Sequence, residues 1–342
     1  MRSPSIPPSE PEPTPTDPTP ADRTPTDPTP ADALEPRLTR VDALTGLGAN
    51  NGSSRDISFI VPSHNRRDAL AQNLPFLLEL QDVLEVIVVV DARSDDGTEE
   101  MVRERYGDDE RVLVLRQAGN GLSAARNAGC RIARGEWVVI SDDDLRYPAD
   151  YGPTLKRVAA EQRADIVGAP WLNLTNGDMA GELAAARARR GGVPTIDDHS
   201  VAPEHEIETP YMPAPALINR RVFERISFDE NYGNTAWRDE TDFFIQAVRT
   251  GFRCMLTSAT AMYQLDQWDG GSRRPRLEYE WAAIKNNWRF VSRHGRWLAA
   301  RGDIKTPSLY QLSFAAGRLR LTLVGFTRAR IARVRGVGSR SR

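Results

Sequence analysis

Between residues 57 and 140, hydrophobic residues occur in short continuous runs that are separated by polar segments. The runs read "ISFIV", "VIVVV", "VLVL" and "WVVI". The segments between them hold leucines at helical spacing in residues 67–80 and helical patterns in "TEEMVRERYG" and "LSAARNAGCRI". A continuous apolar run is typical of a strand that is buried on both faces, and helices between such strands favour parallel pairing. The pattern predicts an α/β fold with an open, mostly parallel sheet flanked by helices.

Polar segments directly follow three of these predicted strands, at residues 62–66, 91–96 and 142–144. In open sheets of this type, ligands bind in the crevice beyond the carboxyl ends of the strands. We therefore expect the three segments to lie along one rim of the sheet and to form a ligand site.

The last of these segments is a run of three aspartates in "WVVISDDD". Side chains two residues apart share a face of a strand, so Asp142 and Asp144 should point together and Asp143 away from them. Paired carboxylates without a neighbouring His or Cys suit a hard divalent ion such as Mg²⁺ or Mn²⁺, which keeps positions open for phosphate oxygens. Alternatively, the aspartates cap backbone donors in an acidic turn. The buried strand before them favours the metal site, because it places the cluster at the rim.

The two ends of the chain differ in composition from its middle. Residues 1–40 hold twelve of the 24 prolines and contain "TPTDPTPAD" twice. Such a segment cannot build a core, so residues 1–54 are predicted to be a disordered proline-rich tail. Residues 55–270 are predicted to form the α/β domain, and residues 271–342 a helical, arginine-rich C-terminal extension.

Charge and cysteine content narrow the class of protein. The net charge of −2 gives no indication of nucleic-acid binding, and two cysteines are too few for a disulfide scaffold. No apolar run approaches the roughly 18 residues of a membrane span, so a cytoplasmic location is expected. Residues 317–342, however, carry eight arginines and no acidic residue among spaced apolar residues. This segment is interpreted either as a peripheral contact with an anionic membrane or as a solvated tail or packing helix.

Five sequence blocks occur in an order that resembles the family 2 glycosyltransferases. They read "VPSHNR", "VVVDARSDDGT", "GLSAARNAGCRIARGEWVVISDDD", "ALINRRVFERISFDE" and "RDETDFFIQAVRTG", and the resemblance covers roughly residues 56–268. It implies a GT-A fold with a Rossmann-like nucleotide-binding half. It also implies an inverting enzyme that moves a sugar from a nucleotide-diphosphate sugar, commonly UDP-linked, to a glycan or lipid-linked acceptor, with Mn²⁺ or Mg²⁺.

The resemblance also implies roles for single residues. Those that match donor-contacting positions of the family are Pro62, Ser63, Asn65, Asp91, Asp142 and Asp143. Asp144, together with Asp142, matches the metal-binding DXD motif. Arg126 is expected to assist the departing diphosphate. The block "RDETD" matches the acceptor-side motif, in which a carboxylate acts as general base. Independently of the resemblance, Trp237 borders this motif, and its aromatic face is expected to stack on a sugar ring of the acceptor.

Two departures from the family pattern leave alternatives open. Relatives usually read Glu-Asp where this chain reads Asp239-Glu240, so either carboxylate is a candidate base, and Glu240 is favoured. Acidic residues are also favoured in a first helical turn without any catalytic role. Gln264 occupies about the place of a metal-binding histidine, so the third metal ligand is open. These departures support a second hypothesis, a catalytically silent sugar-nucleotide-binding or scaffold protein.

Overall fold

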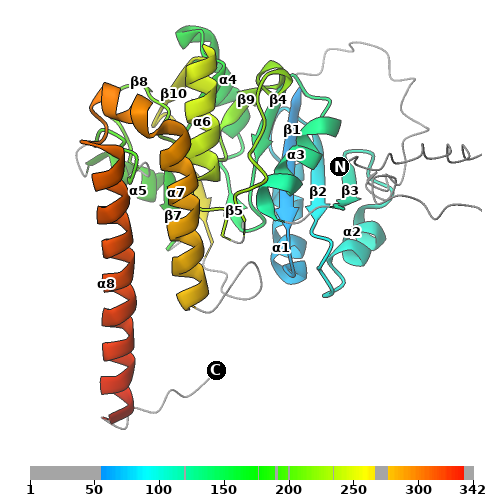
Figure 1. Cartoon of the computed structure of the whole chain (residues 1–342). Helices are drawn as coiled ribbons and strands as arrows, with labels where there is room; N and C mark the ends of the chain where they lie inside the picture. The colour runs from blue at the N-terminus through cyan, green and yellow to red at the C-terminus, as the bar shows by residue number, and fades with distance from the viewer. Residues whose placement is uncertain are drawn as a thin grey trace, which may run out of the picture. The chain divides into compact units, whose positions relative to one another are not determined.

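The apolar runs form the parallel part of an eight-stranded sheet in the computed structural model, whose strand order is β3-β2-β1-β4-β9-β6-β10-β8 (Figure 1). Its strands are β1 (Ile57–Ser63), β2 (Val83–Val90), β3 (Val112–Arg116), β4 (Trp137–Ile140), β6 (Ile166–Gly168), β8 (Ile207–Glu208), β9 (Leu217–Asn219) and β10 (Cys254–Leu256). The structure describes residues 55–118, 121–175, 177–188, 192–198, 201–233, 235–265 and 276–334. The predicted proline-rich tail, residues 1–54, lies outside the described residues.

Strands β1 to β4 pair in parallel, as the continuous apolar runs predict. Alternate residues of β1 enter two different cores. Ile57 and Phe59 pack with α1 (Arg67–Leu78), α2 (Thr98–Tyr106) and α4 (Tyr151–Gln162), whereas Ile60 packs with α3 (Leu122–Ile132) and α6 (Asp239–Thr250). Helices therefore cover both faces of the sheet, and the predicted α/β architecture is confirmed.

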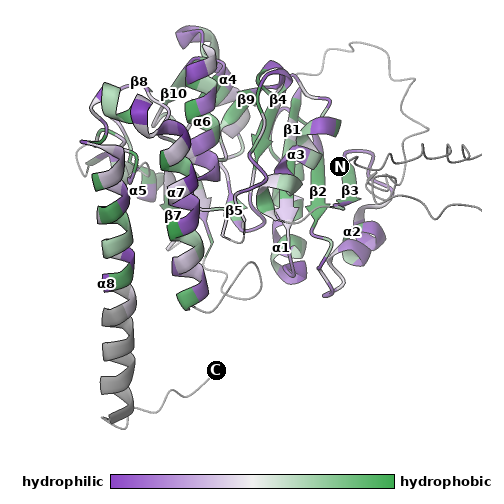
Figure 2. Ribbon diagram, in the orientation of Figure 1, coloured by the Kyte–Doolittle hydropathy of each residue, from purple (hydrophilic) through white to green (hydrophobic). Residues whose placement is uncertain are grey.

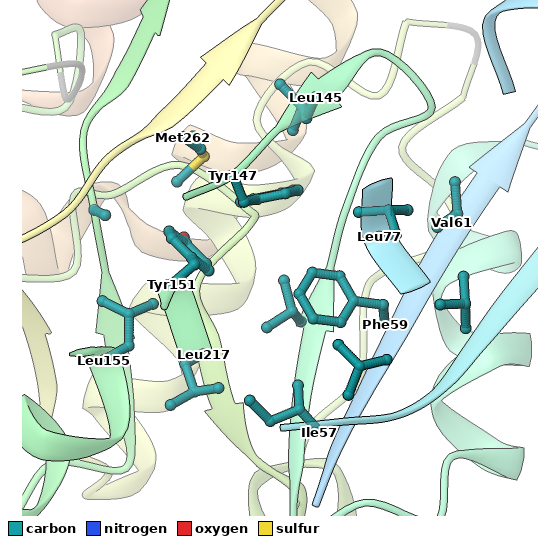
Figure 3. Packing of buried hydrophobic residues seen from close by; sticks show 14 of the residues in the cluster. Ile57, Phe59, Val61, Leu77, Leu145, Tyr147, Tyr151, Leu155, Leu217 and Met262 are labelled. Atoms are coloured by element: carbon teal, nitrogen blue, oxygen red, sulfur yellow. The ribbon is translucent and has the colours of Figure 1, made fainter. Parts of the chain in front are cut away.

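The first of these cores is closed by aromatic side chains beside the aspartate run (Figure 3). Phe59 meets Tyr147 edge to face, with 5.6 Å between ring centroids, and Tyr147 lies 4.7 Å from Tyr151. The Tyr151 hydroxyl donates to the backbone oxygen of Pro215 at 2.5 Å. Figure 2 shows hydrophobic residues concentrated in the central strands, while the outer helix α2 is mostly polar. The aspartates therefore begin at the edge of this buried core.

The second half of the sheet is mixed. Strand β9 is antiparallel to β4 and β6, β10 is parallel to β6, and β8 is antiparallel to β10. A separate three-stranded sheet joins β5 (Leu145–Arg146), β11 (Met262–Gln264) and β7 (Trp171–Asn173). Because β5 starts immediately after Asp144, this small sheet fixes the far side of the aspartate run.

The remaining helices of the described chain are α5 (Met179–Ala188), the short 3₁₀ helix Arg220–Glu224, α7 (Arg276–Arg301) and α8 (Pro307–Val334). Helix α6 ends at Gly251, which has a φ of +97°. Ile245 of α6 packs with Phe290 of α7 in a third core. The domain boundary expected at residue 270 stays a prediction.

Candidate functional site

The three polar rim segments meet at the carboxyl edge of β1, β2 and β4. Ser63 ends β1 and pairs in register with Val90, the last residue of β2. The Ser63 hydroxyl donates to Asp143 Oδ2 at 2.8 Å, which joins the first segment to the aspartate run. His64 Nδ1 lies 3.5 Å from Asp91 Oδ1, which joins the first segment to the second. The three segments that the strand pattern places on one rim are therefore in contact with one another.

The turns after β1 and β2 are tied to each other by Asn65. Its φ of +50° is in the left-handed region, which asparagine tolerates better than most residues. The Asn65 amide donates to Ser94 Oγ at 3.1 Å, and its side-chain oxygen accepts from the Asp95 amide at 2.9 Å. Pro62 lies one residue before the end of β1, opposite Val89. These contacts hold the proposed nucleotide-contacting turn in place.

Asp91 is buried at the end of β2 and is held by two side chains. Arg93 donates to Asp91 through Nε at 2.9 Å and through Nη2 at 3.0 Å, and Gln117 Nε2 donates at 3.0 Å. Burial acts to raise the pKa of Asp91, but the hydrogen bonds and charge of Arg93 outweigh it and hold that pKa below its ordinary value. Arg93, whose side chain is 51% exposed, is thus paired rather than merely solvated.

The aspartate run does not follow the alternation expected of a strand. Asp143 and Asp144 lie in a turn between β4 and β5, and Arg66 reaches both of them, so Asp143 does not point away from Asp144. Asp143 is buried, while Asp142 and Asp144 are only half-buried. Burial raises the pKa of Asp143 to about 7, although the charge of Arg66 opposes this. Arg66 Nη2 donates to Asp144 Oδ2 at 2.5 Å, and its Nε lies 3.3 Å from Asp143 Oδ1. Arg66 is a site residue that the sequence reasoning did not single out, and its position in the first rim segment was the available signal.

The residues around Asp144 fit a divalent ion that brings further ligands with it. Among the residues that the structure describes, no group of three or more His, Cys, Asp or Glu side chains is arranged to hold a metal. Leu265, next to Gln264, donates its amide to the Asp144 backbone oxygen at 3.0 Å, so β11 ends beside the cluster. Gln264 Oε1 accepts from Trp171 Nε1 at 3.2 Å. Mg²⁺ is commonly held by one or two carboxylates plus substrate phosphates, which Asp142 and Asp144 allow.

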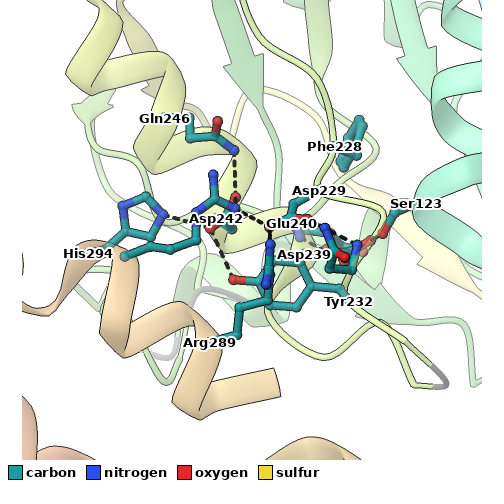
Figure 4. Close-up of polar contacts among 12 residues, drawn as sticks. Ser123, Phe228, Asp229, Tyr232, Asp239, Glu240, Asp242, Gln246, Arg289 and His294 are labelled. Atoms are coloured by element: carbon teal, nitrogen blue, oxygen red, sulfur yellow. Dashed lines mark hydrogen bonds and ion pairs between the residues drawn. The ribbon is translucent and has the colours of Figure 1, made fainter. Parts of the chain in front are cut away.

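The acidic motif at the start of α6 is bound to α3 by one buried arginine. Arg126 Nη1 donates to Asp239 Oδ2 and Nη2 donates to Glu240 Oε1, each at 2.8 Å, and its side chain is 1% exposed. Asp239 also accepts from Ser123 Oγ at 3.0 Å and from the Glu240 amide at 2.8 Å (Figure 4). Glu240 Oε2 accepts from the Ala214 amide at 3.1 Å. Both carboxylates are therefore held in fixed orientations.

The two carboxylates of this motif differ in access to solvent. The Asp239 side chain is buried, whereas that of Glu240 is 24% exposed. Burial raises the pKa of Asp239 to about 6, although the charge of Arg126 and the hydrogen bond from Ser123 oppose this. A substrate hydroxyl can approach Glu240 more readily than Asp239.

Arg126 also lies within electrostatic reach of the aspartate run. Burial raises the pKa of Asp142 to about 7, Arg126 acts to lower it, and Glu240 acts to raise it further. Asp142 and Glu240 come from segments almost a hundred residues apart. The same guanidinium forms an ion pair with Glu240 and acts through its charge on the pKa of Asp142. The structure thus brings the predicted donor-side and acceptor-side residues into one charged centre.

Asp242, the third acid of the motif, is buried on the opposite side of α6. It accepts from Tyr232 Oη at 3.0 Å and from Arg293 Nη1 at 2.9 Å, and it pairs with His294 Nε2 at 2.7 Å (Figure 4). These contacts fasten α6 to α7. His294 shows no functional pattern in the sequence, and its structural role depends on packing between helices distant in the chain.

Trp237 precedes the motif and contacts α8. The Arg318 guanidinium lies 3.9 Å from the centre of its ring, and the ring of Phe314 lies 6.1 Å away. Next to it, Arg238 has a φ of +76° and donates to Asn287 Oδ1 at 3.1 Å and to Tyr310 Oη at 2.5 Å. Helices α7 and α8 therefore hold the segment that leads into the acidic motif, and sugar stacking on Trp237 stays a prediction.

Comparisons with known proteins show what the chain is similar to. Residues 58–180 match the model described as glycosyl transferase family 2. The chain is similar to the uncharacterized glycosyltransferase YibD of Escherichia coli, 31% identical over 43% of this chain and 43% of that protein. It is also similar to the succinoglycan biosynthesis protein ExoO of Rhizobium meliloti, 29% identical over 70% of this chain and 69% of that protein. The match to the first of these relatives thus spans less than half of its length.

A solved structure extends the likeness of the fold. The crystal structure of Staphylococcus aureus TarS 1-349 in complex with UDP-GlcNAc has a TM-score of 0.51 and 17% identity, over 71% of this chain and 73% of that one. At this identity the likeness supports the fold alone. It agrees with the central parallel sheet and its flanking helices.

Proposed function

We propose that the chain is a family 2 glycosyltransferase and an inverting enzyme, which the family match over residues 58–180, the similar glycosyltransferases and the GT-A-like fold support. It takes a sugar from a nucleotide-diphosphate donor, with UDP as the favoured nucleotide, and transfers it to a hydroxyl of a glycan or lipid-linked acceptor. The observation that carries the proposal is the shared charged centre in which Arg126 joins the acidic motif to the aspartate run.

Glu240 is the general base in this proposal. It is the more exposed of the two motif carboxylates, and Arg126 and the Ala214 amide fix the direction of its oxygens. A fixed carboxylate can accept the proton of the acceptor hydroxyl while that oxygen attacks the anomeric carbon from the side opposite the leaving group. One such displacement inverts the configuration at that carbon. Asp239 has its oxygens occupied by Arg126, Ser123 and a backbone amide and acts as a positioning residue.

The donor lies along the rim in this proposal. Pro62, Ser63 and Asn65 contact the nucleotide from the first turn, and Asp91 reads the base. Asp144 and Asp142 would hold Mn²⁺ or Mg²⁺ beside the donor. When bound, the ion offsets the negative charge that gathers on the leaving diphosphate.

Release of free nucleotide from a panel of UDP-, GDP- and dTDP-sugars, with Mn²⁺, Mg²⁺ or EDTA, tests this function. We expect one donor to be hydrolysed slowly in a metal-dependent way and Asp144→Ala to abolish that hydrolysis. Asp95→Asn, which changes an exposed acid on the same rim, is the matched control and should leave it intact. Metal-independent hydrolysis that survives Asp144→Ala would refute the proposed metal site.

The base is tested separately by adding an acceptor. Glu240→Gln should lower transfer by about 10²- to 10⁴-fold while nucleotide binding and slow donor hydrolysis persist. If Asp239→Asn has this effect and Glu240→Gln does not, the assignment of the base is wrong.

The second candidate function, a silent sugar-nucleotide binder, is favoured by the reversed order of Asp239 and Glu240 relative to the family pattern. Calorimetry with the same donors separates the two. Binding of a nucleotide sugar without release of nucleotide, with every acceptor and metal supplied, would establish the binder.

A further inference from the structure

Helix α8 has one face packed against the protein and another face exposed. On the packed face, Gln311 and Thr322 are buried, and Arg318 Nη1 lies 3.2 Å from Glu280 Oε2 of α7. Figure 1 shows α7 and α8 side by side and antiparallel. These contacts fix the rotation of α8 about its axis, so the direction of its outer face is determined.

The outer face of α8 is apolar where a solvated helix would be polar. Leu309, Leu312 and Leu319 are 49%, 68% and 57% exposed, and Ala316 between them is also exposed. Their spacing of three, four and three residues is that of one helical stripe. In the sequence, Leu323 and Phe326 continue the same spacing. We define Leu309, Leu312, Ala316 and Leu319 as the leucine stripe.

Positive charge accompanies the leucine stripe. Arg320 is exposed next to Leu319, and residues 317–342 contain eight arginines and no acidic residue. A helix with an apolar face and flanking arginines binds in the interfacial region of anionic bilayers, where leucines enter the acyl boundary and guanidinium groups meet lipid phosphates. Across the described residues, no helix is both long and apolar enough to cross a membrane. The stripe therefore fits a surface contact rather than a span.

We propose that the leucine stripe of α8 lies on the surface of an anionic phospholipid bilayer. This contact is independent of the transfer chemistry proposed above, because it uses residues outside the charged centre. The contact would also affect the segment that precedes the acidic motif. Arg318 and Tyr310 of the same helix contact Trp237 and Arg238, which precede the acidic motif. A membrane-bound α8 would hold that motif at a fixed position relative to the lipid surface.

Cosedimentation of the full chain with vesicles tests the proposal. The vesicles are phosphatidylcholine alone, or phosphatidylcholine mixed with phosphatidylglycerol, each at low and high salt. We expect binding to the anionic vesicles, weakened by salt, and a loss of at least about tenfold in affinity for the double variant Leu312→Glu/Leu319→Glu. Val193→Glu changes a valine that is 73% exposed outside α8 and should bind like the wild type.

A labelling experiment keeps the proposal testable if the double variant is unstable. Both native cysteines, Cys130 and Cys254, are buried, so Leu312→Cys introduces an accessible thiol for an environment-sensitive dye. Anionic vesicles should shift the emission of this dye to shorter wavelength and leave the dye at Val193→Cys unchanged.

Three outcomes would overturn the proposal. One is no binding of the wild type to anionic vesicles at low salt, and another is equal binding by the double variant. The third is a wild-type protein that is a dimer in light scattering and does not bind vesicles, together with a double variant that is a monomer. That result would assign the leucine stripe to contact with a second copy of the chain. Each of these outcomes leaves the donor-hydrolysis test of the proposed function unaffected.

Discussion

Arg126 is expected to be the most costly side chain of the site to remove. Its guanidinium is 1% exposed and touches Asp239 and Glu240 at 2.8 Å each. In Arg126→Met, a side chain of similar length fills the space but leaves the buried Asp239 carboxylate without its counterion. Removing one partner of a buried ion pair costs about 3–5 kcal/mol, most of it for the charge that stays behind.

Arg93→Met is the matched control for this substitution. Arg93 also makes a bidentate pair with a rim aspartate, Asp91, but its side chain is 51% exposed. Pairs of this exposure are worth only about 0–1 kcal/mol. The free energies of unfolding of the two variants, obtained from denaturant titrations, should therefore differ by roughly 2–5 kcal/mol.

A second substitution separates the lost ion pair from lost packing. If the unpaired carboxylate causes the destabilisation, Asp239→Asn added to Arg126→Met should restore part of the lost stability, because the charge is then gone. Two results would refute this reasoning. One is that Arg126→Met is no more destabilised than Arg93→Met, and the other is that the double variant recovers no stability. The kcat for sugar transfer should fall in Arg126→Met, because Glu240 loses one of its two orienting donors.

Three further predictions concern charge and packing elsewhere in the chain. The pKa values of Asp142 and Asp143 are raised to about 7 each, so above pH 4 the folded state binds more protons than the unfolded state. The free energy of unfolding should therefore fall by up to about 1 kcal/mol per pH unit per group as the pH rises from 5 to 7. Asp142→Asn should flatten that slope in denaturant titrations across this range. Arg66→Ala should tighten Mn²⁺ binding by about tenfold in a paramagnetic resonance titration, because the ion no longer competes with a guanidinium; unchanged or weaker binding would contradict this. Gly129→Ala should lower the free energy of unfolding by about 1–3 kcal/mol in thermal denaturation, because an added Cβ would lie 2.4 Å from an isoleucine methyl of β1. Gly317→Ala is the control: its Cβ would meet nothing within 4 Å, so this change should be neutral or stabilising.

The parallel half of the fold could be predicted from the sequence because its signals are local. Its buried strands are marked by continuous apolar runs, and the polar residues that follow a run mark the rim. The expected alternation of Asp142, Asp143 and Asp144 is wrong, because Asp143 and Asp144 lie in a turn and both contact Arg66. The apolar run does not show at which residue the strand gives way to that turn.

Much of the charged centre could not be predicted, because its contacts join residues far apart in the chain. No local pattern indicates that Arg126 pairs with Asp239 rather than facing the crevice, or that His294 supports Asp242. Likewise, the exposure that separates Glu240 from Asp239 depends on how α6 docks against α3. A sequence motif identifies such residues, but it does not indicate which of two adjacent carboxylates is buried.

The pairing of Arg126 with α6 also has a consequence for the order in which the protein takes shape during synthesis. Its two carboxylate partners follow it by 113 and 114 residues. The ribosome therefore releases β1 to β4 and α3 well before α6 exists. Until α6 docks, the guanidinium of Arg126 must stay hydrated, because burying it without a partner is costly. Strands β1 to β4 can pair early, whereas β10 is made after α6 and the charged centre closes late. A chain that stops at residue 180, where the family match ends, should leave Arg126 open to water.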